Sequence, residues 1–259
     1  TVLMAPMVHW PEVMVTYDET SKWLFSADAF GAFGAINGNL YVDEYNVDFD
    51  LLPEARRYYT NIVGKYGRQV LTLLEKAANL DIAMILPLHG PILRQDMAYY
   101  IEKYSKWASY TPEEHGVVIA YGSIYGNTEK AAELLAAMLA ERGERNIRVY
   151  DVSGWHPSYI LSECFRFDRI VFASSTYNME IYPPMETLLL ELKGHNMQNR
   201  TVAVIENGSW APQSGKKMRE LLAQMKDMRV LDSEISIRSA LTEADTEALA
   251  ALADLLAAS

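Results

Sequence analysis

Three side chains near the start of the sequence could bind a metal ion, and each lies at the end of a short apolar run. They are His9 in Val-His-Trp-Pro, Asp28 in Ala-Asp-Ala-Phe-Gly and His89 in Leu-His-Gly-Pro. Imidazole nitrogen and carboxylate oxygen suit iron, manganese or zinc, and one carboxylate can bridge two ions. Taken singly, each residue has a structural explanation, as a hydrogen-bonded histidine or as an aspartate that caps a turn. The prediction of a metal site therefore depends on the three together.

A second candidate site follows the apolar segment 117–121. The next seven residues are Gly-Ser-Ile-Tyr-Gly-Asn-Thr at 122–128, and a helical pattern begins there. Hydroxyls and free backbone N–H groups would converge at the positive end of a helix, which can bind a phosphate without a lysine. The loop lacks the Gly-Lys-Ser/Thr ending of a triphosphate loop and the Gly-x-Gly-x-x-Gly pattern of a dinucleotide site, so a monophosphate fits best. On local grounds alone, such a loop is more often only a helix cap.

Two more loops at predicted strand ends carry small residues and an aromatic side chain. One is Ser-Ser-Thr-Tyr-Asn-Met at 174–179, and the other is Glu-Asn-Gly-Ser-Trp-Ala-Pro at 206–212. Small residues allow close approach of the backbone, and Tyr177 or Trp210 could stack on a planar ring. Open parallel sheets bind ligands outside the carboxyl ends of their strands, so we expect these loops to flank a flavin ring. Both aromatics could instead be ordinary surface residues.

The elements that would position these loops alternate regularly in the second part of the chain. Strands are predicted at 117–121, 147–152, 169–174, 201–206 and 230–237, and each is followed by a helical pattern. Five such units predict a doubly wound, five-stranded parallel sheet covered by helices on both faces. The first helix is expected to bury a stripe from Ala131 to Leu139 and to end at Gly143.

The first part of the chain has a different pattern. A hairpin is predicted from strands 13–17 and 23–27, and a further strand is predicted at 82–86. Helices are expected from Pro53 towards Ala78, with interruptions at Gly64 and Gly67, and from 95 to 107. The segment 111–114, Thr-Pro-Glu-Glu, is a plausible linker. We therefore expect one domain at 1–112 and a second at 113–259.

Composition excludes several classes of protein. The net charge is −11, which disfavours nucleic acids and anionic lipid surfaces as partners. Cys164 is the only cysteine, so a disulfide and a four-thiolate iron site such as a built-in rubredoxin are excluded. No apolar run approaches the roughly 20 residues that span a membrane, and no signal peptide is recognisable. We expect a cytoplasmic protein.

The Ser-Ile-Tyr-Gly-Asn-Thr loop resembles the flavodoxin phosphate loop, usually T/S-x-T-G-x-T, with Tyr125 in place of the common Thr. This resemblance implies FMN as the cofactor and assigns its contacts to particular residues. The phosphate would be held by Ser123, Ile124, Tyr125, Gly126, Asn127 and Thr128. The ring would be flanked by Ser175, Thr176, Tyr177 and Asn178 and by Asn207, Gly208, Ser209 and Trp210.

The spacing of the metal-ligand candidates also resembles a known family. His9 and Asp28 lie nineteen positions apart, and Asp28 and His89 lie sixty-one apart, as in the second half of the flavodiiron site. By this resemblance His9 and His89 would be terminal ligands of two non-haem irons bridged by Asp28. The implied fold is the C-terminal half of a metallo-β-lactamase-like αβ/βα sandwich, followed by a flavodoxin-like domain.

Membership of the flavodiiron family implies an oxidoreductase that reduces O2 to water, NO to N2O, or both. FMN would relay electrons from an external donor such as rubredoxin or a flavin/NADH reductase. The family also implies a head-to-tail homodimer. Two alternatives remain open: a flavodoxin-type electron carrier with an incomplete, non-catalytic metal half, and, less compatible with a flavin, a zinc hydrolase.

One part of the family pattern is missing from the sequence. The H-x-E-x-D motif that supplies the earlier ligands does not occur, and three ligands cannot hold two irons tightly. Half of a sandwich would also leave strand edges and an apolar face uncovered. We therefore expect a missing N-terminal segment or a companion chain to complete the site, and the chain alone could be inactive.

Overall fold

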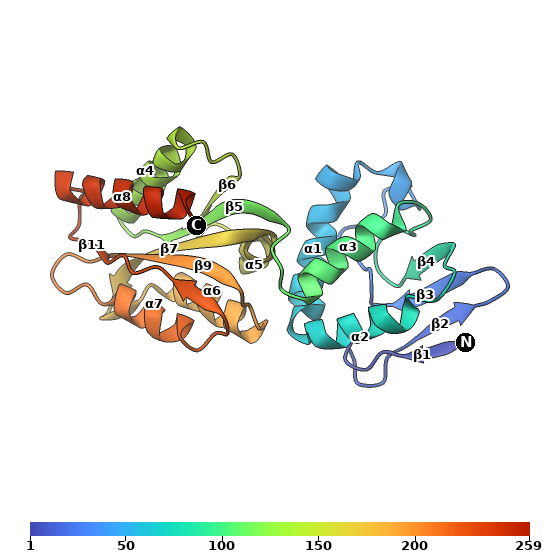
Figure 1. Cartoon of the computed structure of the whole chain (residues 1–259). Coiled ribbons are helices and arrows are strands. Elements are labelled where there is room, and N and C mark those ends of the chain that lie inside the picture. The colour runs from blue at the N-terminus through green and yellow to red at the C-terminus, as the bar shows by residue number, and fades with distance from the viewer. The chain divides into compact units, whose positions relative to one another are not determined.

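The computed structural model describes all residues, 1–259, and separates into two compact units, Thr1–Thr111 and Pro112–Ser259 (Figure 1). Each unit has its own sheet and its own helices. The predicted linker 111–114 is shorter than expected. Glu114 already belongs to the first strand of the second unit, and the backbone N–H of Glu113 donates to the carbonyl of Arg166 at 2.8 Å.

The first unit contains a four-stranded sheet in the order β1-β2-β3-β4. Its strands are β1 (Val2–Met4), β2 (Met14–Asp18), β3 (Trp23–Ala27) and β4 (Met84–Pro87). β1, β2 and β3 pair antiparallel, which confirms the predicted hairpin, and β4 pairs parallel to β3. A parallel connection needs a long crossover, and the helices between β3 and β4 supply it. The three-residue strand β1 was not predicted, because its apolar run is too short to show a periodicity.

Helices cover one face of this sheet. The α-helices are α1 (Leu52–Tyr58), α2 (Gly67–Ala77) and α3 (Met97–Ala108), and the shorter turns are η1 (Val42–Glu44), η2 (Val47–Leu51), η3 (Tyr59–Val63) and η4 (Gly64–Tyr66). The predicted interruptions at Gly64 and Gly67 are confirmed. At Gly67 a Cβ atom would lie 2.2 Å from the carbonyl oxygen of Ala108. Only glycine allows the start of α2 to approach the end of α3 this closely.

The two faces of the first sheet differ in burial. Side chains on the helix-covered face are buried, among them Val15, Leu24 and Ile85. The opposite face carries apolar side chains that remain exposed, with fractions of 54% for Val2, 50% for Met4, 51% for Met14, 38% for Trp23 and 44% for Phe25. The register pairs Met4 with Met14 on this face, while Val2 and Phe25 lie on either side of Thr16 and Trp23 lies beside Asp18. An uncovered apolar face therefore exists in the first unit, as the sequence predicted.

The second unit is built on a sheet in the order β10-β9-β7-β5-β6. Its strands are β5 (Glu114–Gly122), β6 (Ile147–Asp151), β7 (Phe167–Tyr177), β8 (Glu180–Ile181), β9 (Arg200–Asn207), β10 (Met228–Val230) and β11 (Ile235–Ile237). All pairs in this order are parallel, and only the short β8 pairs antiparallel, with the end of β7. The doubly wound parallel sheet is therefore confirmed.

The predicted fifth strand, 230–237, is in fact two strands. β10 and β11 both pair with β9, and residues 231–234 leave the ladder between them. The guanidinium of Arg219 donates to the carbonyls of Leu231 and Ser233 at 3.1 and 2.6 Å. Two carbonyl groups of the interrupted segment therefore accept hydrogen bonds from a helix side chain. Sequence periodicity does not reveal such a contact.

Helices lie on both faces of the second sheet (Figure 1). They are α4 (Asn127–Glu141), α5 (Pro157–Arg166), α6 (Pro183–Gly194), α7 (Ser214–Leu222) and α8 (Glu243–Ala257). α4 and α8 pack together on one face, while α5, α6 and α7 follow one another on the other. The predicted stripe of α4 is confirmed: Ala131, Leu135 and Leu139 are fully buried, and the positive φ of Gly143 follows the helix end. None of the helices combines the length and apolar character that crossing a membrane requires.

Candidate flavin-phosphate and metal-ligand sites

The phosphate-loop candidate lies at the carboxyl end of β5, the strand between β7 and β6. β5 ends at Gly122 and α4 begins at Asn127, so the turn between them is four residues long. Gly126 has φ +82°, a left-handed conformation that glycine adopts without strain. A Cβ atom on Gly122 would lie 2.7 Å from the ring of Tyr182. The two glycines therefore allow a tight turn that connects β5 directly to the 15-residue helix α4.

Two hydroxyl groups in this turn are arranged as a ligand site would require. The Ser123 hydroxyl is buried and has no hydrogen-bond partner. The Thr128 hydroxyl lies 3.0 Å from that of Ser175 at the end of β7, so two of the predicted loops meet. A buried hydroxyl without a partner costs free energy unless a ligand or water satisfies it. Together with the free N–H groups at the start of α4, Ser123 fits a bound phosphate.

One acidic group lies close to this positive helix end. Glu129 is in the first turn of α4, and the hydroxyl of Tyr121 donates to its carboxylate at 3.0 Å. Burial and the Glu129 carboxylate raise the pKa of Tyr121 well above its ordinary value, so this hydroxyl keeps its proton. The hydrogen bond ties Glu129 to β5.

The loops after β7 and β9 form the second part of the flavin candidate. A cavity of about 360 Å³ is lined by both of them, and the residues are Thr176, Asn178, Met179, Gly208, Ser209, Trp210 and Ala211. Five of the seven were predicted to flank the ring, namely Thr176, Asn178, Gly208, Ser209 and Trp210. Met179 and Ala211 were named only as parts of the loop sequences.

Some predicted flavin contacts have structural partners within the protein. The Thr176 hydroxyl accepts from the backbone N–H groups of Gln213 and Ser214 at 2.9 and 3.1 Å. The Asn207 amide exchanges two hydrogen bonds with the backbone of Ser239. These side chains stabilise the loops. Backbone groups and the neighbouring residues are then available to contact a flavin ring.

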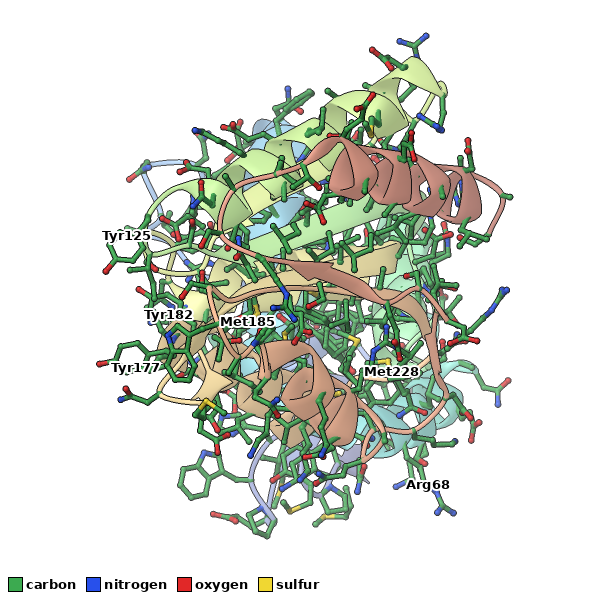
Figure 2. All side chains as sticks on the ribbon, turned by 90° about the vertical axis from the view of Figure 1, so that its left-hand side faces the viewer. Arg68, Tyr125, Tyr177, Tyr182, Met185 and Met228 are labelled. Atoms are coloured by element: carbon green, nitrogen blue, oxygen red, sulfur yellow. The ribbon has the colours of Figure 1, made fainter.

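The aromatic side chains expected to contact the flavin are exposed, both Tyr177 and Trp210 beside the ring and Tyr125 in the phosphate loop. The exposed fractions are 46% for Tyr177, 78% for Trp210 and 90% for Tyr125. Tyr125 and Tyr177 project from the same side of the second unit, where Tyr182 also lies (Figure 2). Exposed aromatics grouped at the carboxyl edge of a parallel sheet suit a planar ligand that binds there.

In the first unit the three metal-ligand candidates converge. The Nε2 atom of His9 lies 3.6 Å from Oδ2 of Asp28, and Nε2 of His89 lies 3.3 Å from Oδ1 of the same carboxylate. Asp28 is buried, while the two imidazoles are partly accessible. Each histidine thus faces its own oxygen atom of a single central carboxylate.

Sheet topology explains why residues so far apart in sequence meet. β1, β3 and β4 run in the same direction, because β1 and β3 both pair antiparallel with β2 while β4 pairs parallel with β3. His9, Asp28 and His89 lie in the segments that follow these three strands. They therefore gather at one edge of the sheet.

The turn that carries Asp28 is held by side-chain hydrogen bonds. The Ser26 hydroxyl donates to the carbonyl of Ala29 at 2.8 Å, and the N–H of Phe30 donates to the Tyr104 hydroxyl at 2.6 Å. The N–H of Ala32 donates to the carbonyl of His89 at 3.2 Å, which joins this turn to the His89 loop. The ligand positions are therefore fixed by the fold of the first unit.

Tyr58 is a site residue that the sequence did not indicate. Burial and the Asp28 carboxylate, including a hydrogen bond to it, raise the pKa of Tyr58 well above its ordinary value. Its ring lies 5.6 Å from that of His89, and a Cβ atom on Gly31 would lie 2.7 Å from it. Tyr58 lies in α1, where its sequence pattern is that of an ordinary buried aromatic.

The two imidazoles approach different oxygens of the Asp28 carboxylate, an arrangement compatible with a carboxylate that lies between two ions. No group of three or more His, Cys, Asp or Glu side chains in the structure is arranged to hold a metal ion. Two histidines and one carboxylate supply only part of the ligands that two irons need.

Comparison with known proteins matches both units. The family model described as "ODP family beta lactamase" matches residues 1–90, and the one described as "Flavodoxin" matches residues 119–252, half of the chain. The structure superimposes on rubredoxin oxygen:oxidoreductase from Desulfovibrio gigas with a TM-score of 0.91 and 30% identity, covering all of this chain and 64% of that one. The chain belongs to the flavodiiron protein family. Its second unit is a flavodoxin-family domain.

Other flavodiiron relatives show the same two-unit match. The chain is 30% identical over 225 residues to the anaerobic nitric oxide reductase flavorubredoxin of Shigella flexneri, covering 86% of this chain and 46% of that protein. The flavodiiron protein of Giardia intestinalis has the same fold, with a TM-score of 0.93 at 23% identity. The chain spans about half of the flavorubredoxin and under two thirds of the solved structures. These relatives are named as an oxygen oxidoreductase, a nitric oxide reductase and a flavodiiron protein.

Proposed function

We propose that this chain supplies the FMN domain and one half of the diiron site of an oxidoreductase that reduces O2 to water, NO to N2O, or both. The observation that carries this proposal is the placement of His9 and His89 on opposite oxygens of the buried Asp28 carboxylate. The same chain carries a phosphate loop with an unpartnered buried hydroxyl. The names of its relatives, an oxygen oxidoreductase and a nitric oxide reductase, support the choice of substrates.

The flavin would be held at the carboxyl edge of the second sheet. Ser123 to Thr128 would donate hydroxyl and backbone hydrogen bonds to the phosphate, while Ser175 to Asn178 and Asn207 to Trp210 would flank the ring. Bound FMN supplies redox chemistry, because it stores two electrons and can pass them on singly. The loop contains no lysine or arginine, so oriented N–H groups and the helix dipole provide the positive potential for the phosphate.

On the metal side, His9 and His89 would bind one iron each, and Asp28 would bridge the two. Tyr58 would help to orient the bridging carboxylate, since Asp28 raises the pKa of its hydroxyl and its ring lies 5.6 Å from that of His89. Hydrogen bonds from outside the ligand set fix ligand orientation in metal sites. The partial exposure of both imidazoles leaves room for further ligands and for a small gas molecule.

The remaining iron ligands would come from polypeptide other than these 259 residues, either as another segment of the protein or as a companion chain. The exposed apolar face of β1, β2 and β3 supports this part of the proposal, because folded proteins seldom leave such a face in water. For the assembled protein we further propose a head-to-tail homodimer and an external electron donor such as rubredoxin or a flavin/NADH reductase. The exposed Trp10 beside His9 would lie near such an interface.

Iron and flavin analysis combined with gas consumption tests the proposal. Purified protein, with any co-purifying polypeptide identified by intact mass, is assayed for iron, FMN, and donor-driven consumption of O2 and NO. About two irons per FMN with gas consumption supports the diiron oxidoreductase. FMN without iron and without gas consumption supports a flavodoxin-type electron carrier, which the incomplete ligand set would favour.

Two matched histidine variants make the assay specific. His89→Ala removes a proposed iron ligand, so iron content and gas consumption fall while bound FMN is unchanged. His195→Ala is the control, because His195 lies at the end of α6 in the flavodoxin domain. Equal loss of activity in both variants would contradict the proposed site.

A further inference from the structure

The first unit contains an apolar cavity between its sheet and its helices. The cavity has a volume of about 230 Å³. Leu24 and Ile85 line it from the sheet, Leu73 and Ala77 from α2, and Ile101 from α3. It lies on the helix-covered face, and so it is separate from the exposed apolar face of the same sheet.

The walls of the cavity are mainly apolar. Ser26 is the one polar residue in the lining, and its hydroxyl already donates to the carbonyl of Ala29 at 2.8 Å. An internal water needs two to four polar partners, and apolar cavities of about 150 Å³ are known to bind xenon or benzene. This cavity is larger and opens partly to the surface, where the lining residue Ala78 is exposed. Its walls therefore favour a small uncharged apolar molecule.

The cavity shares a wall with the metal-ligand site. Ser26 and Phe30 both line it, and Asp28 lies between them in the same turn. The hydrogen bond from the Ser26 hydroxyl closes that turn, and the Phe30 ring packs on Tyr104 with 4.5 Å between ring centroids. The turn that carries the Asp28 carboxylate on one side therefore forms part of the wall of the apolar cavity on its other side.

We propose that this cavity is a binding site for small apolar molecules and that its natural occupant is the diatomic gas consumed at the diiron site that Asp28 would help to form. The choice of occupant rests on the proposed function, whereas binding of an inert gas does not. O2 and NO are uncharged and nearly apolar, so they partition from water into apolar spaces. A gas molecule held behind the Asp28 turn raises the local concentration next to the iron ligands.

Xenon is the probe that tests the site without any redox chemistry. The full chain as purified, with whatever cofactors and partner it retains, is labelled at Leu, Ile and Val methyl groups and exposed to increasing xenon pressure. Saturable shift changes are expected at the methyls of Leu24, Leu73, Ile85 and Ile101. The methyls of Leu135, buried in the flavodoxin domain, are the internal reference. Shifts that are absent, or equally large at Leu135, would overturn the proposal.

Two filling variants and one control locate the binding site. Ala77→Leu and Ile101→Phe add atoms to opposite walls of the cavity, so either is expected to abolish the saturable shifts. Ala98→Leu makes the same alanine-to-leucine change on the exposed side of α3, away from the cavity. This control variant is expected to retain the saturable shifts. Xenon binding that survives in both filling variants would contradict the assignment.

The outcomes for the cavity and for the proposed function are distinguishable. Protein that retains iron and FMN but shows no saturable xenon shifts would refute the cavity and leave the diiron assignment standing. Protein that binds xenon but retains no iron, even with the polypeptide that supplies the remaining ligands present, would refute the diiron assignment while the apolar site remains.

Discussion

Replacing Ser123 with alanine separates a flavin-phosphate site from an ordinary helix cap. The Ser123 hydroxyl is buried and has no partner in the protein. If it serves only the fold, its removal costs nothing, because no hydrogen bond is broken. If it binds phosphate, its removal deletes one hydrogen bond to a charged group.

The expected magnitude follows from the value of such a bond. A hydrogen bond to a charged group contributes about 1.5–3 kcal/mol. Because about 1.4 kcal/mol corresponds to a factor of ten in affinity, Ser123→Ala is expected to raise the Kd for FMN roughly tenfold to a hundredfold. The stability of the FMN-free protein should be unchanged or slightly higher, since an unsatisfied buried hydroxyl has been removed.

Ser233 provides a matched control in the same domain. Its hydroxyl is also buried without a partner, but it lies in the segment between β10 and β11. Ser233→Ala should therefore leave the Kd for FMN unchanged. The assay is fluorescence titration of FMN into stripped protein, with thermal unfolding measured on the FMN-free forms. Equal Kd values for wild type and Ser123→Ala, or equal losses in the two variants, would refute the phosphate assignment.

Three further predictions test other parts of the structure. Asp28→Asn should lower the iron retained per FMN by more than half, measured by elemental analysis, while FMN affinity stays at the wild-type value; unchanged iron would exclude Asp28 as a bridge. Burial raises the pKa of Asp168, but the Gly116 N–H and His115 outweigh it and the net pKa is lowered, so its stabilisation is full above the unfolded value of about 3.9 and is lost progressively as pH falls from there through the lower folded pKa. Asp168→Asn should therefore destabilise the flavodoxin domain near pH 7 and have a smaller effect near pH 3 in urea unfolding, and an equal effect at both pH values would contradict the lowered pKa. Phe25→Lys should reduce association of the chain in sedimentation experiments, because it places a charge on the exposed apolar face; association equal to wild type would show that this face is not the contact.

Much of the flavodoxin domain could be predicted because its signals are local. Each strand is a short apolar run, and α4 repeats apolar residues with the helical period, so element type follows from neighbours in sequence. The division of the fifth strand could not be predicted, since it coincides with hydrogen bonds from Arg219 to Leu231 and Ser233. Such contacts depend on the packing of α7 beside the sheet edge.

The candidate sites show the same limit. His9, Asp28 and His89 could be named from residue type and spacing, yet their convergence depends on the parallel directions of β1, β3 and β4. Tyr58 could not be named, because only the folded first unit brings it to Asp28. Thr176 and Asn207 remain predicted flavin contacts, and in the structure their side chains also bond to backbone groups of neighbouring loops. A polar residue in a loop does not reveal from sequence whether its partner is ligand or backbone.

The central claim, that a flavin domain is joined to half of a diiron site, is tested most directly by one loading measurement. The purified protein is incubated with FMN and ferrous iron without oxygen, desalted, and analysed for flavin absorbance and iron in the same fractions. One FMN should be retained per chain, and iron should rise towards two per FMN once the polypeptide that supplies the remaining ligands is present. Colourless protein after desalting would contradict FMN binding by this chain.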